Sequence, residues 1–239
     1  MTHRYDEAVR YFTAAIERAP KRADVRIMRA EALDALGRNG DARHELEDVV
    51  KLDPKSTLPH LHLGLMDLRA GQLPQAEQHL RDAIRIDPKL AEAHNQLAVV
   101  LALEGRHEES VAAARTAVEL KPDVAAAHGN LGSALARMGR LDEAIAEYRR
   151  SLALDPLFIA SRYNLVGALL RQSRSGEAIP EAQALVAQDP KNSKAWELLL
   201  GALVMSGRRP EAVLEAQRAQ AGGITLSPDV VESLRDRSR

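Results

Sequence analysis

The sequence has no cysteine, few aromatic residues and no excess of either charge. Without cysteine, disulfides, thiolate metal sites and a cysteine nucleophile are excluded. Aromatic residues make up 3% of the 239 residues, so few rings are available for stacking on bases. Lys and Arg number 33 against 34 for Asp and Glu, a formal net charge of −1. Although a local basic patch is compatible with this balance, we expect no nucleic-acid partner and no general binding to anionic membranes.

Long apolar runs are also missing. No uninterrupted run approaches the roughly 18 residues that a membrane span needs. The first residues, MTHRYDEAVRYFTAAIERAP, lack the basic start and apolar core of a signal peptide. We therefore expect a cytoplasmic location. The segment Tyr5–Ala8 matches the middle of the repeat described next, so an upstream half-repeat, and any targeting segment with it, would lie outside this chain.

Prolines recur at a fixed interval of 34 residues. They stand at Pro20, Pro54, Pro88, Pro122, Pro156 and Pro190. A constant period of this length is typical of proteins built from stacked repeats. Within each period, two apolar runs of about fourteen residues have the i, i+3, i+4, i+7 spacing of amphipathic helices. Each period therefore predicts a helix–turn–helix unit.

The turn between the two helices also recurs in phase. It holds Gly37, Gly71, Gly105, Gly139 and Gly207, with Ser173 in the remaining unit. Glycine here suits a helix end that must turn left-handed. We predict repeats at 23–56, 57–90, 91–124, 125–158, 159–192 and 193–226, with the second helix of a half-repeat at 1–22. Residues 227–239 are predicted to form a short capping helix and tail.

Small residues mark where the paired helices approach each other. One position holds Ala8, Ala42, Ala76, Ser110, Ala144, Ala178 and Ala212, and another holds Ala30, Gly64, Ala98 and Gly132 before Val166 and Leu200. Small side chains let helix axes approach to roughly 8–10 Å. Pro180 lies too deep for a first turn, so its helix is predicted to start late, near Glu177, or to kink.

These features resemble the tetratricopeptide repeat (TPR) family over essentially the whole chain. In one unit the family pattern appears as His128, Leu131, Gly132, Gly139, Ala144, Tyr148, Ser151 and Pro156. The Trp usual near the start of the family's first helix survives only at Trp196. The resemblance implies an all-α fold, a right-handed α-solenoid of tandem repeats, that acts as a protein–protein interaction scaffold.

No catalytic or metal site is predicted. His60, His94 and His128 recur at the repeat interval, so their backbones should lie roughly 10 Å or more apart and cannot share one ion. We interpret them as substitutes for the family's bulky packing residue. No HExxH, GxSxG or phosphate-loop pattern is present. We therefore expect no catalytic residue, no cofactor and no enzyme.

The resemblance assigns a binding groove to the first helix of each unit, whose sixth position points into the groove. That position holds His62, Gln96, Asn130 and Asn164. A carboxamide both donates and accepts, so a row of them can pair with the backbone of an extended peptide. The ladder resembles those of peptide-carrying TPR superhelices. The alternative is that amides are merely tolerated at a solvated position.

Basic side chains are predicted about two turns further along the same helices. Arg69, Arg137 and Arg171 occupy that position, with Leu103 breaking the series, and Tyr163 and Lys194 should also face the groove. Because Arg binds a carboxylate through two parallel hydrogen bonds, acidic side chains or a C-terminal carboxylate would suit this floor. The alternative is that the arginines pair with groove carboxylates such as Glu92 and Glu197.

The leading hypothesis is a non-enzymatic adaptor that binds an extended partner segment between Gln96 and Lys194. A second hypothesis is self-assembly into a homo-oligomer, because Ala8, Phe12 and Ala15 lack the helix that should cover them. A third is a regulatory segment of a larger enzyme, such as a glycosyl- or sulfotransferase. The sequence names neither the partner nor the pathway.

Overall fold

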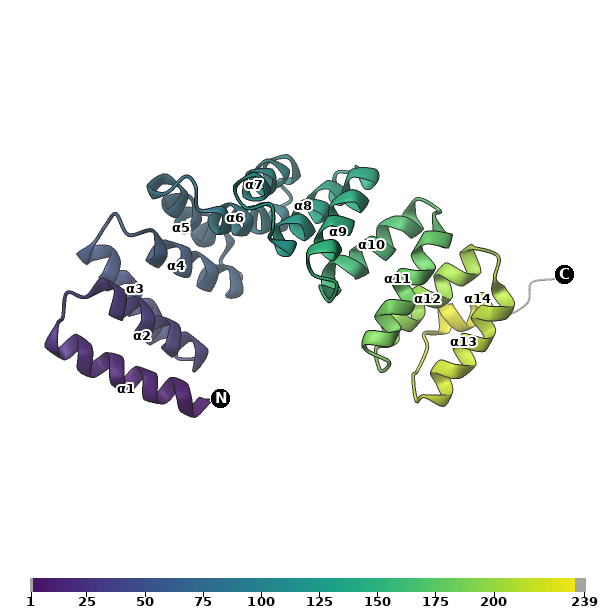
Figure 1. The fold of residues 1–239 in the computed structure, drawn as a ribbon, viewed down its shortest axis with the longest axis horizontal. Helices are drawn as coiled ribbons and strands as arrows, with labels where there is room; N and C mark the ends of the chain where they lie inside the picture. The colour runs from purple at the N-terminus through teal and green to yellow at the C-terminus, as the bar shows by residue number, and fades with distance from the viewer. Residues whose placement is uncertain (1, 235–239) are drawn as a thin grey trace. The chain divides into compact units, whose positions relative to one another are not determined.

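The computed structural model describes residues 2–234 and contains only helices over that range (Figure 1). In chain order they are α1 (Thr2–Arg18), α2 (Ala23–Ala35), α3 (Asn39–Leu52), α4 (Thr57–Arg69), α5 (Leu73–Ile86), α6 (Ala91–Leu103), α7 (His107–Leu120), α8 (Ala125–Arg137), α9 (Leu141–Leu154), α10 (Ile159–Arg171), α11 (Ser175–Gln188), α12 (Ser193–Met205), α13 (Arg209–Ala221) and α14 (Pro228–Leu234). The prediction of an all-α helical repeat fold is confirmed.

The helices from α2 to α13 form six pairs. We call the first helix of each pair, α2 to α12 in even numbers, an A helix, and its partner a B helix. The A helices begin at residues 23, 57, 91, 125, 159 and 193, so successive starts are separated by the repeat interval. The chain divides into an N-terminal unit, up to Lys121, and a C-terminal unit, from Pro122. Each unit has its own stack of paired helices.

The turn between A and B helices has the predicted left-handed conformation. Gly139, after α8, has φ +77°, and the Arg140 N–H donates to the Leu135 carbonyl at 3.0 Å, which closes the helix end. Ser173, after α10, adopts the same conformation with φ +58°. It is the one non-glycine residue of residues 2–234 with positive φ, and an L side chain is strained there.

Close approach of the paired helices depends on the small residues. Ala76 and Ala144 are fully buried on their B helices. A Cβ added to Gly64 would lie 2.8 Å from Leu80 Cγ, so the side chain of Leu80 occupies that space. The recurring pattern of small residues therefore reports the packing of each A helix on its B helix.

Each B helix that precedes an Asp-Pro pair ends with a turn closed by the aspartate. Asp155 Oδ1 accepts from the Leu157 N–H at 2.9 Å, and Asp87 Oδ1 accepts from the Lys89 N–H at 2.9 Å. The proline disfavours helical backbone in the aspartate before it, and the aspartate side chain then satisfies an amide of the turn. The two residues together stop the helix.

One detail at the C-terminal end differs from the sequence-based expectation. Helix α11 begins at Ser175 and contains Pro180, so the predicted late start near Glu177 is wrong. Ile224 and Leu226, in the segment before α14, are both buried. Helix α14 itself has no buried residue and lies against α12 and α13.

Candidate functional site

The predicted peptide-binding residues of the C-terminal unit lie on three successive A helices. Helix α8 carries Asn130 and Arg137, α10 carries Tyr163, Asn164 and Arg171, and α12 carries Lys194. Asn130 is half-buried, immediately before the buried Leu131. Asn164, both arginines and Lys194 are exposed. We call these six residues the A-helix face of the C-terminal unit.

Ser133 connects the A-helix face to the core. Its hydroxyl oxygen accepts from Asn164 Nδ2 at 3.1 Å and from the Tyr148 hydroxyl at 3.4 Å, and it donates to the Gly129 carbonyl at 2.9 Å. These bonds hold the Asn164 carboxamide beside α8. Sequence reasoning missed Ser133, because its role depends on how α8, α9 and α10 pack against one another.

The two arginines lie near the buried ring of Tyr148. Burial raises the pKa of the Tyr148 hydroxyl, while the positive charges of Arg137 and Arg171 act in the opposite direction. Arg171 Nη1 lies 3.5 Å from the Ala136 carbonyl, a long hydrogen bond. Neither arginine has a carboxylate within ion-pair distance in the described residues, so this part of the face carries positive charge.

Tyr163 and Lys194 form a second contact between neighbouring A helices. The Lys194 ammonium lies 5.5 Å from the centroid of the Tyr163 ring, within the range of a cation–π interaction. Burial raises the pKa of the Tyr163 hydroxyl, and the nearby Asp189 raises it further. The pair therefore presents an aromatic surface beside a cation.

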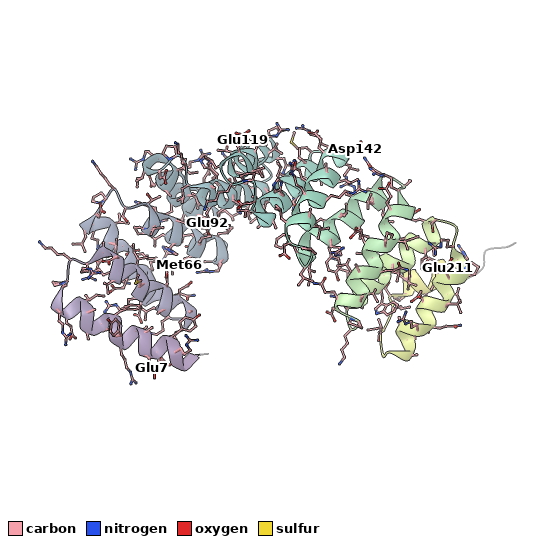
Figure 2. The ribbon with its side chains drawn as sticks, in the orientation of Figure 1. Glu7, Met66, Glu92, Glu119, Asp142 and Glu211 are labelled. Atoms are coloured by element: carbon pink, nitrogen blue, oxygen red, sulfur yellow. The ribbon has the colours of Figure 1, made fainter. Side chains whose placement is uncertain are left out.

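In the N-terminal unit, two of the predicted binding residues contact carboxylates of the same unit. His62 Nε2 lies 3.1 Å from a Glu31 oxygen, and an Arg69 Nη2 lies 2.6 Å from an Asp34 oxygen. Met66, labelled in Figure 2, lines a cavity of about 290 Å³ with these four residues. Arg69 thus follows the alternative reading, pairing with a groove carboxylate.

The remaining residues of this prediction lie elsewhere. Gln96 is half-buried on α6. Arg69 therefore pairs with Asp34 rather than with one of the two carboxylates named above as examples. One of those two, Glu197, accepts a hydrogen bond from the Ser227 N–H at 3.1 Å. The binding role of these residues stays a prediction.

The candidate assembly surface on α1 is partly covered. Ala8, Phe12 and Ala15 are half-buried, since α1 packs on α2. Tyr11, which is 73% exposed, has the most exposed ring of this helix among the described residues, and it meets Phe12 edge to face at 5.9 Å between centroids. Tyr5 is also exposed, at 43%.

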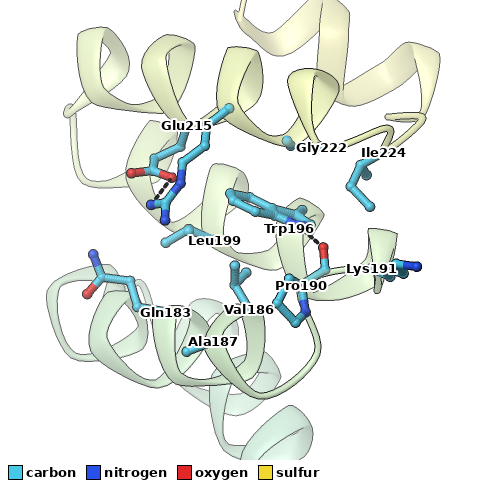
Figure 3. Close-up of a pocket in the computed structure, with 12 residues that line it drawn as sticks. Gln183, Val186, Ala187, Pro190, Lys191, Trp196, Leu199, Glu215, Gly222 and Ile224 are labelled. Carbon is cyan, nitrogen blue, oxygen red and sulfur yellow. Dashed lines mark hydrogen bonds and ion pairs between the residues drawn. The ribbon is translucent and has the colours of Figure 1, made fainter.

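A cavity of about 510 Å³ lies among α11, α12, α13 and the chain near Ile224 (Figure 3). Trp196 forms part of its wall, and the indole N–H donates to the Pro190 carbonyl at 2.9 Å. None of the predicted binding residues lines it. A cavity of about 440 Å³ occupies the equivalent place in the N-terminal unit, with His94 in the position of Trp196. The repeat pattern in the sequence does not reveal these spaces, because they depend on how the helices of neighbouring repeats pack.

Comparisons with known proteins give the same fold. Family models described as "Tetratricopeptide repeat" match residues 2–63, 61–125 and 105–157, and together cover residues 2–157. A model described as "Bacterial transcriptional activator domain" matches residues 150–221.

No helix within residues 2–234 is both long and apolar enough to cross a membrane.

Three solved structures illustrate the likeness. PilW, described as a widely conserved type IV pilus biogenesis factor, matches at 22% identity and TM-score 0.75, over 89% of this chain and 98% of that chain. The APC/C hetero-tetramer Cut9–Hcn1 matches at 23% identity and TM-score 0.74, over 84% of this chain. YrrB, described as a TPR protein with an unusual peptide-binding site, matches at 21% identity and TM-score 0.62, over 77% and 95%. This chain spans 40% of the chain that it matches in Cut9–Hcn1. At these identities the likeness shows the fold alone.

Proposed function

Because this chain belongs to the tetratricopeptide repeat family, we propose that it is a non-enzymatic protein-interaction scaffold. We infer that its C-terminal unit binds an extended segment of a partner protein along the A-helix face. YrrB, a structure of the same fold, is described as having a peptide-binding site. The proposal for this chain is supported by its own residues.

The observation that carries the proposal is the placement of Asn164. Its Nδ2 donates to Ser133 Oγ at 3.1 Å, and the side chain is exposed on α10. A carboxamide held in this way keeps its oxygen available to accept from a peptide N–H. Recognition through the peptide backbone is largely independent of the peptide's side chains.

The charges on the same face favour acidic segments. Arg137, Arg171 and Lys194 are exposed cations on three neighbouring A helices. In the N-terminal unit, by contrast, Asp34 neutralises the equivalent Arg69. The C-terminal unit is therefore the better receptor for carboxylates, and Tyr163 beside Lys194 offers an aromatic contact to an apolar side chain.

The proposal is tested with peptides selected from a random-peptide display library on the purified chain. A selected peptide is labelled with a fluorophore, and its affinity is measured by anisotropy for wild type and for Asn164→Ala. We expect a loss of about five- to tenfold, as one net hydrogen bond contributes about 1 kcal/mol. The control is Gln217→Ala, which removes an exposed amide from the B helix α13. Equal affinity of the two variants, with unchanged helicity, would contradict the proposal.

A second measurement separates backbone pairing from side-chain contact. Peptides are made in which one backbone amide at a time is replaced by an ester, which lacks the N–H. One ester should weaken binding to wild type and leave binding to Asn164→Ala unchanged, because the pair is already broken there. If every ester weakens both proteins equally, Asn164 does not read the peptide backbone.

Self-assembly through α1 is a second candidate function, favoured by the exposed ring of Tyr11. Sedimentation velocity over a wide concentration range tests it. A dimer that Tyr11→Ser dissociates would support assembly through α1. A monomer at every concentration would contradict it.

A further inference from the structure

One pair of positions recurs between each A helix and its B helix. The first position is the fourth residue of each A helix, and the second is the residue 19 positions later, on the B helix. In successive repeats the first position holds Arg26, His60, His94, His128, Arg162 and Trp196. In three of these pairs, a basic side chain on the A helix contacts a glutamate on the B helix. Arg26 meets Glu45 at 3.1 Å, His128 meets Glu147 at 2.6 Å, and Arg162 meets Glu181.

The same A-helix residues bond the proline carbonyl six residues earlier. His94 Nε2 lies 3.0 Å from the Pro88 carbonyl, and His128 Nε2 lies 3.0 Å from the Pro122 carbonyl. Trp196 forms the equivalent bond with Pro190. A histidine at this position therefore normally has a fixed partner supplied by the repeat.

The pair formed by α4 and α5 departs from this pattern. Here the fourth residue, His60, faces a second histidine, His79, with ring centroids 5.8 Å apart and an angle of 43° between the rings. The Nδ1 atoms of both rings are buried and have no hydrogen-bond partner in the described residues. Buried polar atoms without a partner are rare in native proteins and call for an explanation.

Asp82 completes a cluster around the two rings. It lies one turn after His79 on α5, so both side chains project from the same face of the helix. One ligand atom from each of His60, His79 and Asp82 lies within 4.8 Å of the others. We propose that these three residues bind a divalent transition-metal ion, with zinc as the test case, which joins α4 to α5.

The donor set and its exposure suit such an ion. Two imidazoles and a carboxylate are ligands that zinc accepts, usually with water at the fourth position of a three-residue site. Tetrahedral ligands at about 2.1 Å from zinc lie roughly 3.4 Å apart, so small side-chain rotations from the observed spacing would close the site. The His60 residue is 9% exposed, whereas the Asp82 side chain is 21% exposed. The ion would therefore reach the buried histidine from the solvent side.

Asp67 supplies a further feature of metal sites. It is fully buried on α4, forms an ion pair with Arg43 through one oxygen, and leaves its Oδ2 without a hydrogen bond in the described residues. That oxygen lies 3.8 Å from His79 Nε2. Metal-binding histidines commonly direct their second nitrogen toward a carboxylate, which fixes the ring. With Nε2 facing Asp67, the nitrogen of His79 left for an ion is the unpartnered Nδ1.

Two neighbours of Asp82 also bear on the site. Gln78 Nε2 donates to one oxygen at 3.0 Å, and an Arg85 Nη2 lies 2.9 Å from the other. The Arg85 side chain is 73% exposed, so it can move into solvent when an ion arrives.

The test uses the untagged full chain, stripped of metal, with zinc added against a chromophoric chelator. We expect one zinc per chain, with at least a tenfold loss of affinity in His79→Gln and in Asp82→Asn, and a loss of about tenfold in Asp67→Asn. Arg85→Ala should bind as tightly as wild type or more tightly. The matched control is His94→Gln, since His94 holds the same repeat position but faces Ala113 and Thr116 at the equivalent places. This control should bind zinc like wild type.

A spectroscopic readout distinguishes the site from scattered surface histidines. Cobalt(II) bound by two imidazoles and a carboxylate should give visible d–d absorption that His79→Gln abolishes and His94→Gln retains. Circular dichroism of the metal-free variants shows that each is folded, and zinc should raise the melting temperature of wild type but not of His79→Gln. Absence of one-to-one zinc binding by wild type, or equal losses in His79→Gln and His94→Gln, would overturn the proposal.

Discussion

The ring of Tyr148 occupies the space that a side chain at Gly132 would need. A Cβ added to Gly132 would lie 2.7 Å from Tyr148 Cε1 and 3.2 Å from the Ala144 carbonyl oxygen. Tyr148 is 2% exposed, so its ring has little room to move. The absence of a side chain at Gly132 in α8 therefore leaves the space that the Tyr148 ring of α9 fills.

Gly132→Ala should lower the free energy of unfolding by about 1–3 kcal/mol, the usual cost of overpacking a core. Gly167→Ala is the matched control, because Gly167 lies in α10 and an added Cβ would meet no atom within 4 Å. This control should raise stability by about 0.5–1 kcal/mol through helix propensity. Urea unfolding of the two variants measures both values. Equal effects would show that Tyr148 does not restrict Gly132.

Ser173→Gly should raise the free energy of unfolding by about 1 kcal/mol, because φ +58° strains an L side chain. The control is Ser206→Gly, at the C-terminal end of α12, one residue before the position that corresponds to Ser173. Ser206 has φ −85°, and its hydroxyl donates to the Leu203 carbonyl at 2.8 Å, so glycine there should lower stability. Thermal melts compare the two variants. A loss of stability in both would contradict the strain at Ser173.

The lowered pKa of Glu177 predicts that the free energy of unfolding decreases at acidic pH. Hydrogen bonds from Arg174 and then Arg149 lower its pKa from 4.5 to about 2. A lowered pKa in the folded state contributes stability above the unfolded value, and this contribution is lost as the pH falls from about 5 toward 2. Stability of Glu177→Gln, measured by urea unfolding, should therefore fall less than that of wild type across this range. Parallel pH profiles would contradict the contribution, which is small because the group is exposed.

The sequence predicts the helix pairs well because their boundaries depend on local chemistry. Glycine at the turn, proline after the B helix and the helical spacing of apolar residues each act over a few residues. Pro180 is the exception: of the two outcomes expected from its position, a late start or a kink, the late start was wrong, because α11 begins at Ser175 and contains the proline.

The candidate site could be predicted only in part. The family pattern assigns Asn164 and Arg171 to the A-helix face, but the bond from Asn164 to Ser133 depends on the contact between two repeats. The His60–His79 pair was detectable in principle. Arg26 with Glu45, and Arg162 with Glu181, show the same spacing of 19 residues in the sequence. Recognising it required knowing which faces of the two helices meet.

The charge of the A-helix face predicts a salt-dependent preference for acidic peptides. Replacing both Arg137 and Arg171 by Gln should weaken binding of a selected acidic peptide by about two- to thirtyfold at low salt, since each of the two exposed pairs contributes about 0.2–1 kcal/mol. The loss should shrink as salt rises, because exposed charges are screened. Arg69→Gln is the matched control: Arg69 already pairs with Asp34 at 2.6 Å, so its removal should change affinity little. Anisotropy titrations at several salt concentrations measure both variants. If Arg69→Gln weakens binding as much as the double variant, the cations of the C-terminal unit do not select the peptide.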